Sequence, residues 1–188
     1  TIFPIGGGPS CSAAVQFAEG IHGTNASGEA ANDGKDTARD TYKVATAVIS
    51  VSKTSSVYSD PINGVAAGAR AIPGAVIRYT ISVANAVGGA SATLSTITDA
   101  LAGSLKIVSS AGGASWNVTG STRGAGTASG TLTADNSAAD GLAHGDPANP
   151  GGTLTATLTT ILPADGSYAA GELKAGETVN IVFDVTIQ

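Results

Sequence analysis

The chain carries little charge, few aromatic side chains, one cysteine and no methionine. Charged residues make up 12% of its 188 residues, about half of the ~25% found in an ordinary soluble domain. Either partner subunits or sugar cover much of the exterior, or the surface belongs to a secreted protein made polar by Thr, Ser and Asn. Because aromatic residues reach only 4%, Val, Ile, Leu and Ala must build the core.

The other absences exclude whole classes of protein. With Cys11 alone, the chain has no disulfide framework. No apolar run approaches the ~18 residues that cross a bilayer, so we expect no membrane span. The net charge is −5 and the nine basic residues are scattered. Nucleic acid is therefore not an expected partner, because phosphate binding needs clustered Lys and Arg.

Composition divides the chain into an arm and a domain. Residues 1–43 are rich in Gly, Ser and Ala and end in the charge-dense stretch 33–43, which forms a short helix or a polar loop. From residue 44 to residue 188 the sequence is typical of β-structure, with Gly, Pro, Asn and Asp between short apolar stretches. We therefore expect an extended N-terminal arm, residues 1–43, followed by one β-domain, residues 44–188.

Alternating apolar and polar residues predict two long strands, over residues 75–85 and 178–188. This period of two is typical of strands with one buried face. Both strands follow a glycine, Gly74 or Gly176, at the same spacing. Their predicted inward residues are Ile77, Tyr79, Ile81 and Val83 in the first strand, and Val179, Ile181, Phe183 and Val185 in the second.

Shorter patterns complete the predicted domain. Residues 46–53 place Ala47, Ile49 and Val51 on one face, and residues 153–162 place Leu154, Ala156 and Leu158 on one face. Weaker strand candidates are residues 91–98, 104–110, 115–120 and 127–134. Many short strands without helical patterns between them predict an all-β, antiparallel β-sandwich.

Residues 51–101 hold a series of short motifs: Lys53–Thr54, Ser59–Asp60–Pro61, Asn63–Gly64, Ile72–Pro73–Gly74, Tyr79, Ile81, Val83, Asn85 and Asp99. At these positions the chain resembles a bacterial module of unknown function that recurs in large surface and secreted proteins. The resemblance covers roughly residues 44 to 188, is specific in the first half of the domain and is loose after Leu101. It implies an immunoglobulin-like β-sandwich on the outside of a cell and no catalytic residues.

Candidate chemistry is sparse, and we expect neither an enzyme nor a cofactor. Asp135, Asp140 and Asp146 lie in one Gly-rich loop, where their carboxylates either hold calcium or make turns. The two histidines, His22 and His144, lie among Gly and small residues and are expected in exposed loops. A metal or catalytic pair is the alternative, but few residues near either histidine could serve as ligands.

Two Asn-x-Ser/Thr sequences, at Asn25 and Asn117, are candidate sites for N-linked sugar. Asn117 lies between Trp116 and Val118, so it points outward if those two residues point inward. O-linked sugar on Thr or Ser is an equal alternative. Trp116 is expected in the core, although an exposed Trp is also the natural stacking platform of a sugar-binding module.

The arm carries large apolar residues that a free tail would leave in water. Full burial of each stabilises by roughly 1.5–3 kcal/mol, so the arm either folds back on its own domain, stays disordered, or inserts into a neighbouring copy. We favour insertion, with Ile2, Phe3, Ile5, Val15 and Phe17 as anchors and Ile77, Tyr79, Ile181 and Phe183 lining the acceptor groove.

Insertion predicts the structural subunit of an extracellular, cell-surface filament. Its partners would be identical subunits, with glycans as possible covalent additions. The alternative is a monomeric carbohydrate-binding or adhesive module of a surface protein.

Overall fold

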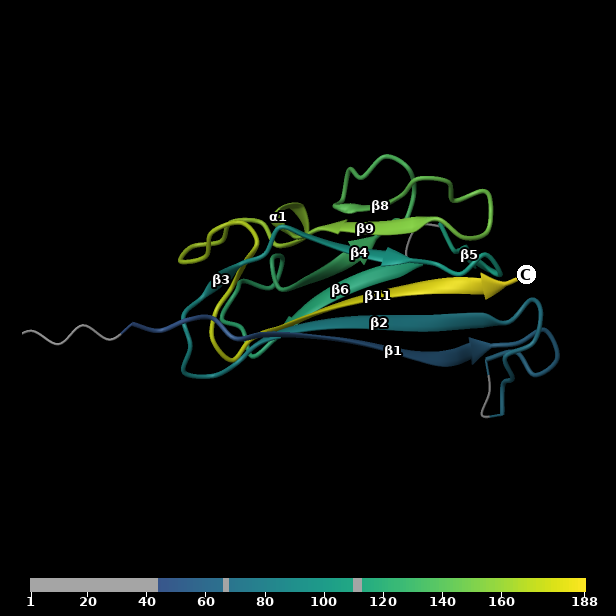
Figure 1. Cartoon of the computed structure of the whole chain (residues 1–188), viewed down its shortest axis with the longest axis horizontal. Coiled ribbons are helices and arrows are strands. Elements are labelled where there is room, and N and C mark those ends of the chain that lie inside the picture. Colours follow the sequence, from purple (N-terminus) through teal and green to yellow (C-terminus); the bar gives the residue numbers. More distant parts are fainter. Residues whose placement is uncertain (1–43, 66–67, 110–112) are drawn as a thin grey trace, which may run out of the picture. The chain divides into compact units, whose positions relative to one another are not determined.

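The computed structural model describes residues 44–65, 68–109 and 113–188 (Figure 1). Residues 45–188 form one compact unit. The expected arm, residues 1–43, lies outside the described residues. So do the residues on which the sequence predictions for the arm rest: Ile2, Phe3, Ile5, Cys11, Val15, Phe17, His22, Asn25 and the stretch 33–43.

Two antiparallel sheets pack face to face in this unit (Figure 1). The larger sheet has the order β1 (Ile49–Ser59), β2 (Val76–Asn85), β11 (Thr178–Ile187), β6 (Ala114–Thr119) and β7 (Ser129–Leu132), and β5 (Leu105–Ile107) also pairs with β11. The smaller sheet has the order β4 (Thr96–Ala100), β9 (Thr153–Thr157) and β8 (Leu142–His144). A separate pair joins β3 (Ala92–Thr93) to β10 (Glu172–Leu173).

Every ladder between these strands is antiparallel, which confirms the predicted all-β, antiparallel sandwich. The described residues contain one helix, α1 (Leu158–Ile161), of four residues. None of their helices is long and apolar enough to cross a membrane.

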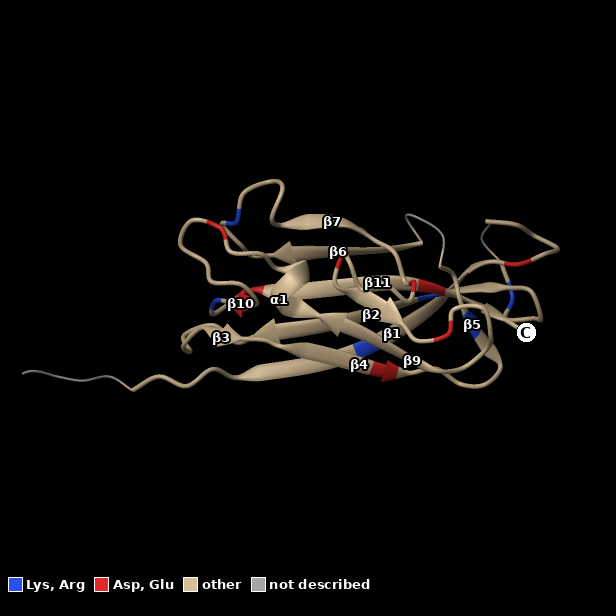
Figure 2. Cartoon of the chain, turned by 90° about the horizontal axis from the view of Figure 1, so that it is seen from above, with Lys and Arg blue, Asp and Glu red and all other residues tan. Residues whose placement is uncertain are grey.

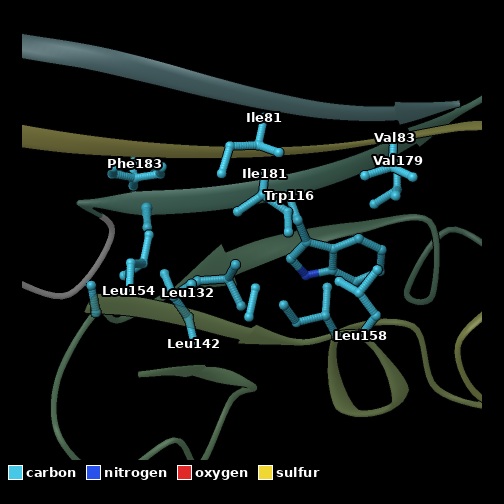
Figure 3. Close-up of a cluster of buried hydrophobic side chains, with 14 of the residues drawn as sticks. Ile81, Val83, Trp116, Leu132, Leu142, Leu154, Leu158, Val179, Ile181 and Phe183 are labelled. Atoms are coloured by element: carbon cyan, nitrogen blue, oxygen red, sulfur yellow. The ribbon is translucent and has the colours of Figure 1, made fainter. Parts of the chain in front are cut away.

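The core lies between the sheets and is built mainly from aliphatic side chains, as the composition predicts (Figure 3). Strands β2 and β11 form the centre of the larger sheet, and their predicted inward faces are confirmed. The side chains of Ile81, Val179 and Ile181 are at most 5% exposed. Trp116 of β6 is 7% exposed and points into the same cluster, so its interpretation as a core residue is confirmed.

Two expectations in the second half of the domain are wrong. The strand predicted over residues 153–162 ends at Thr157, where the one-turn helix α1 begins. Alternation continued past that point because Leu158, Ile161 and Leu162 are all buried. His144 does not lie in an exposed loop, because it belongs to β8 and is fully buried.

A shared turn geometry precedes the two central strands. Gly74 and Gly176 have φ angles of 84° and 86°, in the left-handed region that favours glycine. The N–H of Gly74 donates to the carbonyl of Ile187, and the N–H of Gly176 donates to the carbonyl of Asn85. Each glycine thus ties the start of one central strand to the end of the other.

Candidate functional site

β1 is the outermost strand of the larger sheet, and its inner face is exposed. Val51 pairs directly with Val83, so both side chains point to the same side of the sheet. Val83 is 2% exposed, whereas Val51 is 64% exposed. Ile49, two residues earlier on the same face of β1, is also exposed. The smaller sheet therefore covers β2 but does not extend over β1.

β4 is the edge strand of the smaller sheet on the same side of the sandwich. Asp99 of β4 points inward, because it pairs with buried Leu154. The Nζ of Lys53 on β1 lies 2.6 and 2.8 Å from the two carboxylate oxygens of Asp99. This ion pair joins the edges of the two sheets, and Figure 2 shows the blue position of β1 beside the red position of β4.

No strand in the described part of the chain pairs with the outer edge of β1 or with the free edge of β4. Edge strands present unpaired N–H and C=O groups to an incoming strand. We call this region the open side and define it by the inward residues of both edge strands: Ile49, Val51, Lys53, Ser55 and Val57 of β1, and Ile97 and Asp99 of β4.

Tyr79 lines the open side and rests on the buried ring of Phe183. The ring of Tyr79 stacks on that of Phe183, with centroids 5.5 Å apart. The Nζ of Lys53 lies 4.3 Å from the centroid of the Tyr79 ring, so the ammonium group has both an aromatic face and the Asp99 carboxylate as partners. Because Lys53 is neutralised in this way, the only charged side chain on the inner face of β1 is satisfied locally.

A pocket lies at the end of the open side where β1 stops and β2 begins. Its volume is about 320 Å³. The lining is mostly apolar and comes from β1, β2 and the loop before it, from β5 and from the end of β11: Ser55, Ser56, Val57, Ala71, Ile77, Tyr79, Leu105 and Ile187.

The predicted acceptor groove is therefore only partly accessible. Ile77 and Tyr79 line the pocket, as a groove residue must. Ile181 and Phe183 are 1% and 0% exposed, because they lie on the central strand β11 beneath the smaller sheet. These two residues do not line an open groove, and that part of the acceptor prediction is wrong.

Asp60, one of the motif residues noted in the sequence, holds the loop next to this pocket by hydrogen bonds. Its carboxylate accepts hydrogen bonds from the backbone N–H groups of Ile62, Asn63 and Arg70 and from the side-chain amide of Asn63. The Asn63 side chain and backbone hydrogen bonds hold the pKa of Asp60 far below its usual range. Gly64 closes the turn at a φ angle of 63°.

Asn85, at the other end of the motif, is a buried structural amide. Its side chain donates to the carbonyls of Ala90 and Leu173 and accepts from the N–H of Val48. These bonds connect three segments: Val48 just before β1, Ala90 in the loop after β2, and Leu173 of β10. The matching positions of the motif thus build the frame around the open side.

The three aspartates proposed for calcium do not converge. Asp140 accepts backbone N–H bonds from Thr133 and Leu142. Hydrogen bonds from Ser137 and Asn149 lower the pKa values of Asp135 and Asp146, respectively. The described residues contain no group of three metal-ligating side chains, so each of these aspartates organises its own turn.

Asn117 points outward from β6, as the sequence predicts. Trp116 and Val118 on either side are 7% and 9% exposed, whereas Asn117 is exposed. Its partners across the sheet are Asn180 of β11 and Ser129 of β7. A sugar on this residue would project from the outer face of the larger sheet, away from the open side.

Sequence reasoning missed a buried polar cluster formed by residues that lie far apart in the chain. The guanidinium of Arg123 donates to the carbonyls of Pro163 and Glu172 and lies 4.2 Å from the ring of Tyr168. The hydroxyl of Tyr168 donates to buried Glu177. No local spacing signals this cluster. These hydrogen bonds all join residues of this cluster to one another or to nearby backbone carbonyls, so we interpret the cluster as a structural link between loops and not as a binding site.

Comparisons with known proteins assign neither a family nor a function to the chain. No family model matches the chain, and no curated protein or solved structure matches it.

Proposed function

We propose that the protein is the structural subunit of an extracellular filament, in which the N-terminal segment of one copy fills the open side of the next. The observation that carries this proposal is the pairing of Val51 with Val83, one largely exposed and the other buried on the same sheet face. No strand among the described residues covers the inner face of β1, and the sequence offers an apolar segment that needs cover.

Charge supports the match between segment and groove. Residues 1–18 contain no charged side chain. The open side is apolar except for the Lys53–Asp99 ion pair and a serine. An inserted strand would gain backbone hydrogen bonds at a sheet edge and bury apolar side chains between the sheets, which is the physical basis of strand addition. Each large apolar side chain fully buried contributes roughly 1.5–3 kcal/mol.

Insertion into a neighbour produces a polymer because the two contacting surfaces differ. One copy contributes its segment and the next contributes its open side, and such a heterologous contact repeats without closing unless the rotation forms a ring. A cell-surface location follows from the resemblance to modules of bacterial surface proteins. The alternative of a sugar-binding module loses its stacking platform, because Trp116 is buried. No catalytic step or cofactor enters the proposal.

Electron microscopy of the purified full chain tests the proposal. The wild type should form fibres. Deletion of residues 1–20 should give soluble monomers, and so should Val51→Asp, which places a charge in the open side. Because Val51 is already 64% exposed, the melting temperature of the Val51→Asp monomer should stay close to that of the deletion monomer.

Ser52→Asp is the matched control. Ser52 is the next residue along β1, is exposed, and points to the outer face opposite Ser82. This variant should still form fibres. Isolated particles from the wild type, or fibres that survive deletion of residues 1–20, would refute the proposal.

A further inference from the structure

The chain enters the sandwich at the end opposite the pocket. The carbonyl of Thr46 accepts from the N–H of Ala90, and that of Val48 accepts from the N–H of Ala86. We call this end the Ala90 pole. The pocket lies at the other end of β1, beside Val57 and Ala71, which we call the Ala71 pole. The 11 residues of β1 separate the poles, a span of roughly 36 Å.

This placement sets the direction of an inserted segment. In a head-to-tail array of equally oriented copies, the chain that leaves one copy at its Ala90 pole meets the next copy at its Ala71 pole. The segment then enters the open side from the pocket end, with its first residues farthest from the pocket. It therefore runs parallel to β1 of the copy that receives it.

Charge limits which residues can lie beside the pocket. Residues 19–43 contain eight charged side chains, beginning with Glu19, whereas residues 1–18 contain none. The uncharged stretch therefore ends at Ala18, and Phe17 is the last large apolar side chain before the first charge. Residues 19–45, if extended, span up to roughly 90 Å, enough to reach a neighbouring copy.

We infer that Phe17 of one copy fills the pocket at the Ala71 pole of the next copy. The pocket is mostly apolar and holds about 320 Å³, and an aromatic side chain gains most from such a site. Val15 lies on the same face of an extended segment, two residues further along the groove. This inference rests on the proposed filament and adds the direction and register of its contact.

Disulfide trapping between two different full-length chains tests the inference. Both chains carry Cys11→Ser. The donor chain carries Phe17→Cys, and the acceptor chain carries Ser55→Cys at the pocket rim. Because each chain has one cysteine, a bond that joins donor to acceptor must be intermolecular. The two are unfolded together, refolded and oxidised, and the mixed dimer is measured by mass spectrometry.

Three further variants serve as controls. Ala18→Cys is a second donor that keeps Phe17 in place, in case the loss of Phe17 prevents assembly. Phe3→Cys is a donor from the other end of the uncharged stretch. Thr54→Cys is an acceptor one residue from Ser55, on the outer face of β1 opposite Thr80.

We expect mixed dimers of the Ser55→Cys acceptor with the Phe17→Cys or the Ala18→Cys donor. These dimers should exceed those from Phe3→Cys, or from the Thr54→Cys acceptor, at least tenfold. If Phe3→Cys instead bonds best to Ser55→Cys, or if wild-type fibres form and neither expected donor bonds to it, the inference is overturned while the filament proposal stands. If the wild type forms no fibres, the filament proposal itself fails.

Discussion

At the scale of single residues, His144 is the least expected part of the core. The side chain is fully buried, and neither ring nitrogen has a hydrogen-bond partner among the described residues. Its ring packs against Gly152, where an added Cβ would lie 2.9 Å from the Cε1 and Nε2 atoms. Burying polar atoms without partners costs free energy, so the histidine contributes shape rather than polar contacts.

His144→Leu tests this interpretation by chemical denaturation. Replacing unpartnered polar atoms by an apolar side chain should leave the free energy of unfolding unchanged or raise it by about 1 kcal/mol. His144→Asn is the control, because it keeps polar atoms and leaves a void, and it should lower the free energy of unfolding by about 2 kcal/mol or more. A loss in the leucine variant as large as that in the asparagine variant would refute the interpretation.

Asp60 makes stability depend on pH. Hydrogen bonds from Asn63, Arg70 and Ile62 favour the ionised carboxylate and lower its pKa in the folded state. The unfolded pKa is about 3.9. The stabilisation is therefore fully present above about pH 4 and is lost as the pH falls toward the lower folded pKa.

We expect Asp60→Asn to flatten the fall in melting temperature between pH 5 and pH 2 and to lower the melting temperature at pH 7. The pKa values of Asp165 and Glu172 are lowered too, so the slope should shrink without vanishing. Thermal unfolding followed by circular dichroism across this range measures both effects. An unchanged slope would show that the Asp60 carboxylate is not held in its ionised form by the loop.

At the scale of elements, the turns before β2 and β11 are alike in backbone and differ in surroundings. Gly74 and Gly176 both have φ angles near 85°, where an L side chain costs about 1–2 kcal/mol. A Cβ on Gly74 would lie 2.9 Å from Cγ of Pro61, in the loop that Asp60 organises. A Cβ on Gly176 would lie 3.0 Å from Cγ1 of Val87, which is 85% exposed and free to rotate.

Alanine substitutions separate the backbone cost from the steric cost. Gly176→Ala should lower the free energy of unfolding by about 1–2 kcal/mol, from backbone strain alone. Gly74→Ala should lower it further, because the proline ring cannot move without disturbing its loop. Urea denaturation of the two variants measures the difference, and equal losses would contradict the proposed clash.

The sequence predicted well those strands in which the alternation of apolar and polar residues follows directly from burial of one face. Strands β2 and β11 alternate because each has one face in the core and one half-buried face on the outside of the sheet. The predicted strand over residues 153–162 was too long because buried residues continue into α1. Strand β8 was missed because it has only three residues, and its burial of His144 depends on Gly152, a contact that no local pattern reveals.

For Ile49 and Val51, the alternation predicted the strand but not the burial of its side chains. It correctly predicted a strand and its inner face, and a buried face is the ordinary reason for such a pattern. These side chains are exposed in the structure because no strand of the smaller sheet lies over β1. Sequence alternation reports that a face needs cover, but only the sheet order shows whether the described part of the chain supplies it.

At the scale of the whole domain, the two sheets differ in width. The larger sheet places five strands in one row and the smaller sheet three. The strand left uncovered by the described residues is β1, and the Lys53–Asp99 ion pair bridges from it to β4. An ion pair that solvent still reaches contributes little to stability, about 0–1 kcal/mol. Among the described residues, the core therefore encloses the inner faces of β2 and β11 and leaves that of β1 exposed.

This asymmetry predicts how amide hydrogen exchange changes on assembly. In the monomer formed by deletion of residues 1–20, β1 should exchange faster than β2 and β11, because an edge strand with few buried contacts opens locally at low cost. In the wild-type filament, the inserted segment would pair with the edge and bury Val51. Exchange in β1 should then slow by on the order of tenfold or more, equivalent to at least about 1.4 kcal/mol.

Mass spectrometry after exchange in the two states measures this change peptide by peptide. Peptides from β6 and β7 provide the internal control, because these strands lie on the other side of the larger sheet and should change little. Protection that appears in β6 and β7 while β1 stays unchanged would place the contact between copies elsewhere. Slower exchange confined to β1 and β4 would locate it on the open side, since these are the two edge strands that the Lys53–Asp99 ion pair joins.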